Sequence, residues 1–236
     1  MNQIQNPSHI VGVIGGMGPA ATVDFMSKVI ASTPATCDQE HIPMVVSSLP
    51  NLPDRSTCLL NGGPSPLPAL LYRLQLLEKA GATCIVITCN TAHYWFPQLQ
   101  KAASVEMISM IDSVAEAASQ SRFAKVGLLA TDATVSTGLY QAALDKKGID
   151  CVVPKGAVQK AAMDGIYTYK GGNLQKARQI IQEAYLYLQQ QQVEAIVLGC
   201  TEVPLILANE VRQTPASFLD SNKILAEAVV RWYRAQ

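Results

Sequence analysis

The chain has 236 residues, of which 49% are hydrophobic and only 15% are charged, and its 18 basic and 18 acidic residues cancel. Without a basic stripe the chain lacks the feature that binds a phosphate backbone, which excludes nucleic acid as an expected partner. No apolar run reaches the roughly 20 residues of a membrane helix, and residues 1–7 lack the pattern of a signal peptide. We therefore expect no membrane association and a cytoplasmic location.

The low share of charged residues, against roughly 25% in soluble proteins, fits a compact protein with sheets covered on both faces. It also favours a homodimer, since an interface removes surface from solvent.

In the first half, the predicted elements alternate between strands and helices. Residues 10–14 form a strand that breaks at a glycine turn, and Pro19 suits the first turn of a helix over residues 20–32. A strand at 43–48 runs into a proline-rich loop that holds Asp54 and Arg55, a helix follows over about 68–80, and an apolar strand leads to Cys89. This βαβαβ order is typical of a parallel α/β sheet.

The second half repeats the first. Strands are predicted at 126–131 and 149–153, a helix over 174–190, and another apolar strand leads to Cys200. The separation from the opening strand to the cysteine is 78 residues in the first half (11 to 89) and 74 in the second (126 to 200). Such recurrence predicts a duplicated α/β lobe.

The predicted fold class is α/β, with two pseudosymmetric lobes, each a short parallel sheet flanked by helices, and a site in the cleft between them. We expect the first lobe to span residues 1–112 and about 220–236, because the terminal helix at 222–234 is expected to return to it. Residues 113–219 form the second predicted lobe.

Cys89 and Cys200 end two matching apolar runs, residues 85–91 and 196–202, which align without a gap. Ligands collect beyond the carboxyl ends of parallel strands, so two thiols at such ends can face one small molecule from two sides. A single buried cysteine more often serves packing, but two in equivalent lobes favour chemistry. A thiolate acting as base and a thiol acting as acid would move a proton between the faces of a carbon atom.

The other cysteines carry no comparable signal. None of the six forms a CxxC pair or lies near a pair of histidines, which disfavours a metal site. A reducing cytoplasm disfavours disulfides. We expect Cys84 and Cys151 to serve packing.

The glycine turn at residues 15–19 imitates a dinucleotide fingerprint. However, no acidic residue ends the second predicted strand, and Pro19 stands where the backbone should approach a pyrophosphate. A nucleotide cofactor is therefore disfavoured. The turn and the following helix N-terminus instead predict backbone N–H groups offered to a carboxylate.

Four motifs together resemble the cofactor-independent aspartate/glutamate racemases: Gly-Gly-Met-Gly-Pro at 15–19, Pro-Asp-Arg at 53–55, Cys-Asn-Thr-Ala-His at 89–93 and Gly-Cys-Thr-Glu at 199–202. The resemblance implies two lobes, a site between them, often a homodimer, and a two-base mechanism without pyridoxal phosphate, metal or nucleotide. Relatives on this scaffold isomerise maleate, racemise hydantoins or decarboxylate arylmalonates, and the decarboxylases use one cysteine. Glu202 replaces a histidine of the cell-wall glutamate racemases, which indicates the aspartate-racemase branch.

Matching positions imply the site residues. Cys89 and Cys200 are the expected catalytic pair, and the expected substrate-binding residues are Met17, Asn51, Arg55, Asn90, Thr91, Thr131, Thr134, Lys170, Thr201 and Glu202. The resemblance implies that Arg55 and Lys170 hold the distal carboxylate, which suits the two-pronged guanidinium of arginine. Asn51 would read side-chain length, and the asparagine and threonines would bind the α-carboxylate or orient the thiols. His93 either polarises a thiol or braces the helix start.

The expected reaction is inversion at the α-carbon of aspartate or glutamate, with the small acidic amino acid as the only partner besides a second copy of the chain. A maleate-type cis–trans isomerase with a covalent cysteine adduct and a non-catalytic binder of acidic amino acids remain alternatives. Which cysteine begins as the base stays open.

Overall fold

The computed structural model describes residues 7–236. Residues 1–6, which hold most of the segment lacking a signal-peptide pattern and the start of the first predicted lobe, lie outside the described residues. No helix in the described part of the chain has the length and apolar character to cross a membrane.

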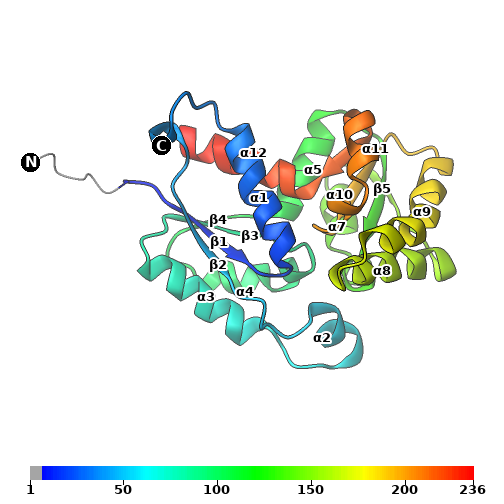
Figure 1. Cartoon of the computed structure of the whole chain (residues 1–236), viewed down its shortest axis with the longest axis horizontal. Coiled ribbons are helices and arrows are strands. Elements are labelled where there is room, and N and C mark those ends of the chain that lie inside the picture. Colours follow the sequence, from blue (N-terminus) through cyan, green and yellow to red (C-terminus); the bar gives the residue numbers. More distant parts are fainter. Residues whose placement is uncertain (1–6) are drawn as a thin grey trace, which may run out of the picture.

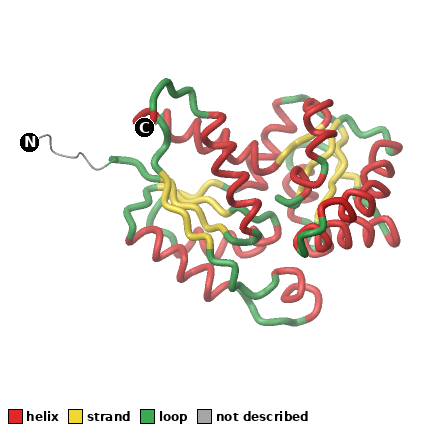
Figure 2. Tube along the Cα trace, viewed as in Figure 1, coloured by secondary structure: helices red, strands yellow, loops and turns green. Residues whose placement is uncertain are grey.

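Residues 7–236 form two four-stranded parallel sheets with the same internal order, β2-β1-β3-β4 and β6-β5-β7-β8. Figure 2 shows the two groups of strands as separate sheets, each with helices around it. The strands are β1 (Val11–Gly15), β2 (Met44–Ser48), β3 (Cys84–Ile87), β4 (Glu106–Ile108), β5 (Lys125–Ala130), β6 (Asp150–Val152), β7 (Ala195–Gly199) and β8 (Phe218–Asp220). The repeated order confirms the predicted fold class of two pseudosymmetric α/β lobes.

Helices cover both faces of each sheet. They are α1 (Pro19–Ser32), α2 (Arg55–Asn61), α3 (Leu67–Lys79), α4 (Phe96–Ala102), α5 (Met110–Gln120), α6 (Asp132–Ser136), α7 (Leu139–Asp145), α8 (Gly156–Lys170), α9 (Leu174–Gln190), α10 (Val203–Ile206), α11 (Ala208–Gln213) and α12 (Ser221–Arg234), with 3₁₀ helices η1 (Asp38–Glu40), η2 (Thr91–Trp95) and η3 (Pro215–Ser217). The first sheet has α3 and α4 on one face and α1 and α12 on the other. The second has α5 and α7 on one face and α8 and α9 on the other.

The terminal helix α12 joins the two halves. It packs against α1 and α5, and Figure 1 shows it, in red, crossing beside the blue α1. Leu225 and Val229 belong to the same buried cluster as Val13 of β1 and Phe25 of α1. Ile224, on the same helix, belongs to the core of the second sheet. The C-terminal helix therefore buries apolar surface of both sheets.

The first strand of each half contains a Val-Gly pair, at 11–12 and 126–127, and packing explains its glycine. A Cβ atom on Gly12 would lie 2.9 Å from Cβ of Ala82, and one on Gly127 would lie 3.1 Å from a side-chain carbon of Leu188. In each of the central strands β1 and β5, the glycine therefore leaves room for a side chain that packs closely against the sheet. The two halves share this packing detail as well as their strand order.

The four predicted helices are present, and α1, α3, α9 and α12 begin within one residue of the predicted positions. The predicted loop is correct for Asp54 but wrong for Arg55, which begins α2. The prolines at 50 and 53 precede this helix, where they cost no helical hydrogen bond, and the Asp54 carboxylate caps it by accepting from the Thr57 amide at 2.8 Å. The helix α8 was also missed, because it buries only Ala162, Gly165 and Ile166 and so lacks a strong apolar stripe.

Candidate active site

A small cavity lies where the carboxyl ends of the two sheets meet. Its lining comes from both halves of the chain: Met17, Asp54, Arg55, Ser56, Cys89, Asn90, Thr91, Thr131, Tyr167, Lys170, Cys200, Thr201 and Glu202. Its volume of about 10 Å³ holds roughly one water molecule. An adjoining depression of about 640 Å³ shares Met17, Arg55, Lys170 and Glu202 with it.

Ten of the twelve expected site residues line the cavity, and two do not: Asn51 and Thr134. Asn51 is exposed, and its Oδ1 accepts from the buried guanidinium of Arg73 at 3.3 Å. Thr134 is fully buried behind the cavity wall. Sequence reasoning missed Asp54, Ser56 and Tyr167 as lining residues; of these, Asp54 stood inside the quoted Pro-Asp-Arg motif.

Cys200 follows β7, and its thiol contacts a carboxylate. Its Sγ donates to Oε2 of Glu202 at 3.0 Å, and both side chains are buried. Burial and the negative charge of Glu202 raise the pKa of Cys200 well above its usual value. The structure therefore favours the protonated thiol at this position.

Cys89 follows β3 and shares the cavity with Arg55. Burial opposes the charge of Arg55, but the nearby Cys89, together with Asp54 and Glu202, raises the pKa of its guanidinium. Arg55 Nη1 donates to the Pro53 carbonyl at 3.2 Å, while its buried Nε has no hydrogen-bond partner among the described residues. A buried, unpaired guanidinium N–H on a cavity wall is suited to an anionic ligand.

Glu202 gathers donors from three parts of the chain. Its Oε1 accepts from the backbone amide of Gly18 at 3.0 Å and lies 3.5 Å from Nζ of Lys170. Its Oε2 accepts from Cys200 and, at 3.3 Å, from the Thr201 hydroxyl. The side chain of Glu202 therefore connects the glycine turn of the first lobe to the second lobe.

The glycine turn does not offer its amides freely. The Gly16 amide donates to Oγ1 of Thr22 at 2.9 Å, and the Gly18 amide donates to Glu202. Gly16 has φ +84°, and a Cβ there would lie 2.7 Å from the backbone of Leu49, so the turn requires glycine. The expectation that these amides await a substrate carboxylate is wrong for both, because side chains already occupy them.

Three buried threonines form a closed hydroxyl cluster across the lobes. Thr91 Oγ1 lies 3.0 Å from Thr131 Oγ1 and 2.8 Å from Thr134 Oγ1, and the last two are 2.9 Å apart. Thr91 and Thr131 line the cavity, and Thr134 fixes both from behind.

Asn90 is held by a second cross-lobe network. Its Oδ1 accepts from the hydroxyl of Tyr140, and its Nδ2 donates to Ser221 Oγ at 3.1 Å. Ser221 in turn donates to the Leu198 carbonyl of β7 at 2.8 Å. Tyr140 and Ser221 lie 50 and 131 residues from Asn90 in sequence, so no local motif indicated them.

His93 has a structural role. Its Nδ1–H donates to the Cys89 carbonyl at 2.8 Å, and its Nε2 accepts from the Met110 amide at 3.0 Å. Burial lowers the pKa of His93 to about 4, so the ring is neutral with both nitrogens used. This geometry favours the brace among the two open readings.

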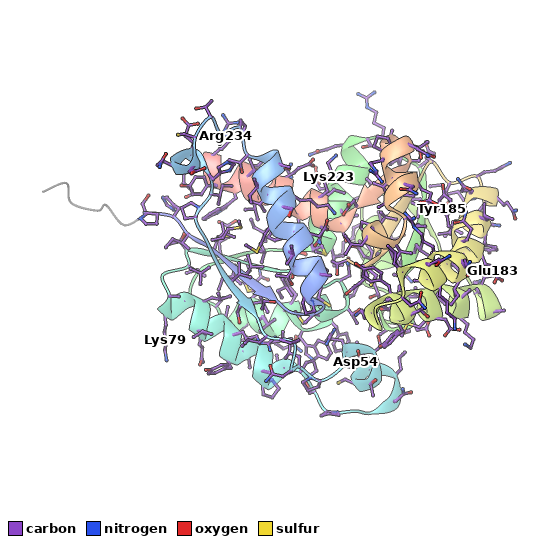
Figure 3. The ribbon with its side chains drawn as sticks, in the orientation of Figure 1. Asp54, Lys79, Glu183, Tyr185, Lys223 and Arg234 are labelled. Atoms are coloured by element: carbon purple, nitrogen blue, oxygen red, sulfur yellow. The ribbon has the colours of Figure 1, made fainter. Side chains whose placement is uncertain are left out.

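The helix α8 brings Lys170 to the cavity. Burial alone would lower the pKa of Lys170, but the nearby Glu202 carboxylate outweighs it and the pKa is raised, so the ammonium stays charged. One turn earlier, the Tyr167 hydroxyl donates to Oδ1 of Asp54 at 3.0 Å. Asp54 caps the start of α2, in the lower part of Figure 3, and its bond to Tyr167 joins the two lobes beside the cavity.

The remaining cysteines are set apart from this site. Burial raises the pKa of both Cys84 and Cys151 to about 12, which keeps each a neutral thiol. Among residues 7–236, no group of three or more His, Cys, Asp and Glu side chains is placed to hold a metal ion.

Comparison with known proteins relates the whole chain to one family. The Asp/Glu/Hydantoin racemase family matches residues 14–229. An aspartate racemase from Picrophilus torridus has a TM-score of 0.85 and 35% identity, covering 94% of this chain and 93% of that one. An aspartate racemase homologue from Pyrococcus horikoshii OT3 has a TM-score of 0.73 and 27% identity, covering 96% and 99%.

Among curated proteins, the broad specificity amino-acid racemase RacX of Bacillus subtilis is 28% identical over 233 residues, which is 96% of this chain and 99% of that protein. The family match spans far more than half of the chain, and the Picrophilus enzyme exceeds 30% identity over nearly its full length. The chain therefore belongs to the Asp/Glu/hydantoin racemase family and is, by class, a racemase and an isomerase.

Proposed function

We propose that this protein interconverts the L- and D-forms of aspartate, glutamate or both, without pyridoxal phosphate, by proton transfer between Cys89 and Cys200. One observation carries the proposal: the two thiols follow equivalent strands of two equivalent lobes and line one cavity. The aspartate racemases among the relatives support the acidic substrate, and RacX supports a wider range.

The protonation of the pair sets the first step. Cys89, beside the guanidinium of Arg55, acts as thiolate base and takes the α-proton, leaving the electron pair on the α-carbon. Cys200 then gives its S–H proton to the opposite face of that carbon. At the end Cys89 carries the proton and Cys200 is the thiolate, so the reverse reaction starts from Cys200.

The carbanion-like state needs donors already fixed in place. The hydroxyls of Thr91 and Thr131 and the amide of Asn90 are buried and held by neighbours, which supports a role at the α-carboxylate. Arg55 and Lys170 supply positive charge for the distal carboxylate. Because Asn51 lies outside the cavity wall, we assign it to positioning Arg73 rather than to substrate contact.

The test is racemisation in D₂O with no added cofactor, followed by chiral chromatography and mass spectrometry. We expect inversion of aspartate or glutamate with one deuterium at the α-carbon, and loss of inversion in Cys89→Ala and in Cys200→Ala. Full activity in either variant would contradict the two-base mechanism. A stable cysteine–substrate adduct would favour a maleate-type isomerase, and binding without inversion would favour a non-catalytic binder.

We also propose a cytoplasmic homodimer. Free cysteines persist in a reducing compartment, and Tyr72 and Leu76 place exposed apolar side chains one turn apart on α3. Sedimentation analysis of the purified protein tests the dimer, and cell fractionation tests the location.

A further inference from the structure

The charges around the cavity can be matched to those of an acidic amino acid. Two cations, Arg55 and Lys170, and two carboxylates, Asp54 and Glu202, line it. Aspartate and glutamate carry two carboxylates and one α-ammonium group. The two cations serve the distal carboxylate and neutral donors serve the α-carboxylate, so the ammonium group still needs an anionic acceptor.

Asp54 is poorly placed for that task. Its Oδ1 caps α2 through the Thr57 amide and hydroxyl, and it also accepts from Tyr167 at the edge of the cavity. The side chain is partly exposed. An ammonium bound there would lie beside solvent and away from Cys200.

Glu202 is placed next to the reacting centre. Its side chain is buried, and its Oε2 lies 3.0 Å from Sγ of Cys200. A carbon atom that exchanges a proton with this sulfur must touch it. A nitrogen on that same carbon is therefore within reach of the Glu202 carboxylate.

The partners of Glu202 differ in how firmly they hold it. The Gly18 amide and the Cys200 thiol both lie at 3.0 Å, but Lys170 Nζ lies at 3.5 Å, beyond the usual range for an N–H···O hydrogen bond. The side chain of Lys170 is also 26% exposed, against 3% for Glu202. Of these partners, Lys170 is therefore the one whose separation from Glu202 costs the least free energy.

We propose that Glu202 binds the α-ammonium group of the substrate, which takes the place of the Lys170 ammonium, while Lys170 turns to the distal carboxylate. One ammonium replaces another, so the buried carboxylate stays paired throughout. The inference rests on the proposed function, since it concerns a substrate with a free amino group. It assigns to Glu202 the recognition of that group.

The test compares each amino acid with its analogue that lacks nitrogen: aspartate with succinate, and glutamate with glutarate. Binding is measured by calorimetry on the wild-type protein and on Glu202→Gln. We expect the wild type to bind at least one amino acid more tightly than its analogue. In Glu202→Gln that preference should fall by about tenfold or more, because only the amino acid loses a charge-assisted partner.

Asp54→Asn is the matched control, since it removes the other carboxylate of the cavity wall and should leave the preference unchanged. Equal weakening of the amino acid and its analogue in Glu202→Gln would overturn the inference. Two results with the wild-type protein would also overturn it: binding of succinate and glutarate as tight as that of the amino acids, or no binding of either amino acid. These wild-type measurements do not depend on the folding of a variant. A wild-type preference that is lost in Glu202→Gln, together with no racemisation by the wild type, would instead contradict the proposed function alone.

Discussion

Cys89 and Cys200 end equivalent strands, yet their side chains face groups of opposite charge. Cys200 donates to the carboxylate of Glu202, whereas Cys89 shares the cavity with the guanidinium of Arg55. Burial and Glu202 raise the pKa of Cys200. The pseudosymmetry of the backbone therefore does not extend to the charged groups around the two thiols.

Alkylation by iodoacetamide should report this difference. At pH 7 we expect Cys200 to react more slowly than Cys89, because only the thiolate is nucleophilic. In Glu202→Gln the pKa of Cys200 should fall, and its alkylation rate should rise by about tenfold for each unit of pKa. The rates are read by peptide mass spectrometry with the exposed Cys37 as internal reference. An unchanged Cys200 rate in the variant would contradict the electrostatic role of Glu202.

Tyr140 does not line the cavity, but it holds Asn90, which does. Its buried hydroxyl donates to Oδ1 of Asn90, so Tyr140→Phe leaves a buried acceptor unpaired. We expect a loss of about 1–3 kcal/mol in the free energy of unfolding and a lower kcat, since Asn90 loses its fixed orientation. Urea denaturation and steady-state kinetics check both.

Tyr185→Phe is the control for that substitution. The Tyr185 hydroxyl accepts from Gln189 within α9, on the far side of the second lobe (Figure 3). We expect this variant to lose less stability than Tyr140→Phe and to keep its kcat. Equal effects from both substitutions would mean that Tyr140 acts only as a packing residue.

At the scale of elements, His93 connects the end of β3 to the start of α5. It accepts from the first amide of α5, that of Met110, and donates to the Cys89 carbonyl. The helix η2 that holds it therefore fixes the backbone of Cys89 against the start of α5, a helix that packs in the core of the second sheet.

This contact predicts a pH dependence of stability. The pKa of His93 is lowered from 6.5 to about 4 by burial, so the unfolded chain takes up a proton at a higher pH than the folded one. The contribution of His93 is complete above pH 6.5 and is lost as the pH falls toward 4. The loss amounts to about 3 kcal/mol, because one pKa unit corresponds to about 1.4 kcal/mol.

Urea denaturation at pH 7, 5.5 and 4 measures that loss, with His93→Gln as the comparison. Glutamine keeps a donor and an acceptor but does not titrate in this range. We expect the stability difference between the wild type and the variant to shrink as the pH falls. Parallel pH profiles would show that His93 does not titrate with folding.

How far the sequence predicts these elements depends on the range of the interactions that form them. The strands that lead to Cys89 and Cys200 are visible because each is a continuous apolar run, and α9 because its buried residues recur with helical spacing. Arg55 and Lys170 were matched by motif, yet the helices α2 and α8 that carry them were missed. Tyr140 and Ser221 were missed because their contacts with Asn90 exist only after the lobes have packed.

At the scale of the whole molecule, the site is closed, because a cavity of about 10 Å³ is too small for an amino acid. On the side of α1 and α12, buried or partly buried bonds tie α1 to α12 and to the end of β8, among them Asn222 Nδ2 to the Ala21 carbonyl at 2.9 Å and Lys28 to Asp220 at 2.7 Å. Beside the adjoining depression, α2 and α8 meet through the exposed bond between Tyr167 and Asp54. This exposed bond is easier to break than the buried ones, so we expect substrate to enter where α2 and α8 meet.

Tyr167→Phe should make a parting of α2 from α8 easier, because it removes the hydroxyl that donates to Asp54 and leaves the ring in place. We expect faster amide hydrogen exchange in α2 and α8 and a higher association rate for aspartate or glutamate in stopped-flow binding. Tyr72→Phe is the matched control, since its ring is 61% exposed on α3 and away from the cavity. If exchange in α2 and α8 and the association rate both match those of the control, substrate does not enter by a parting of α2 from α8.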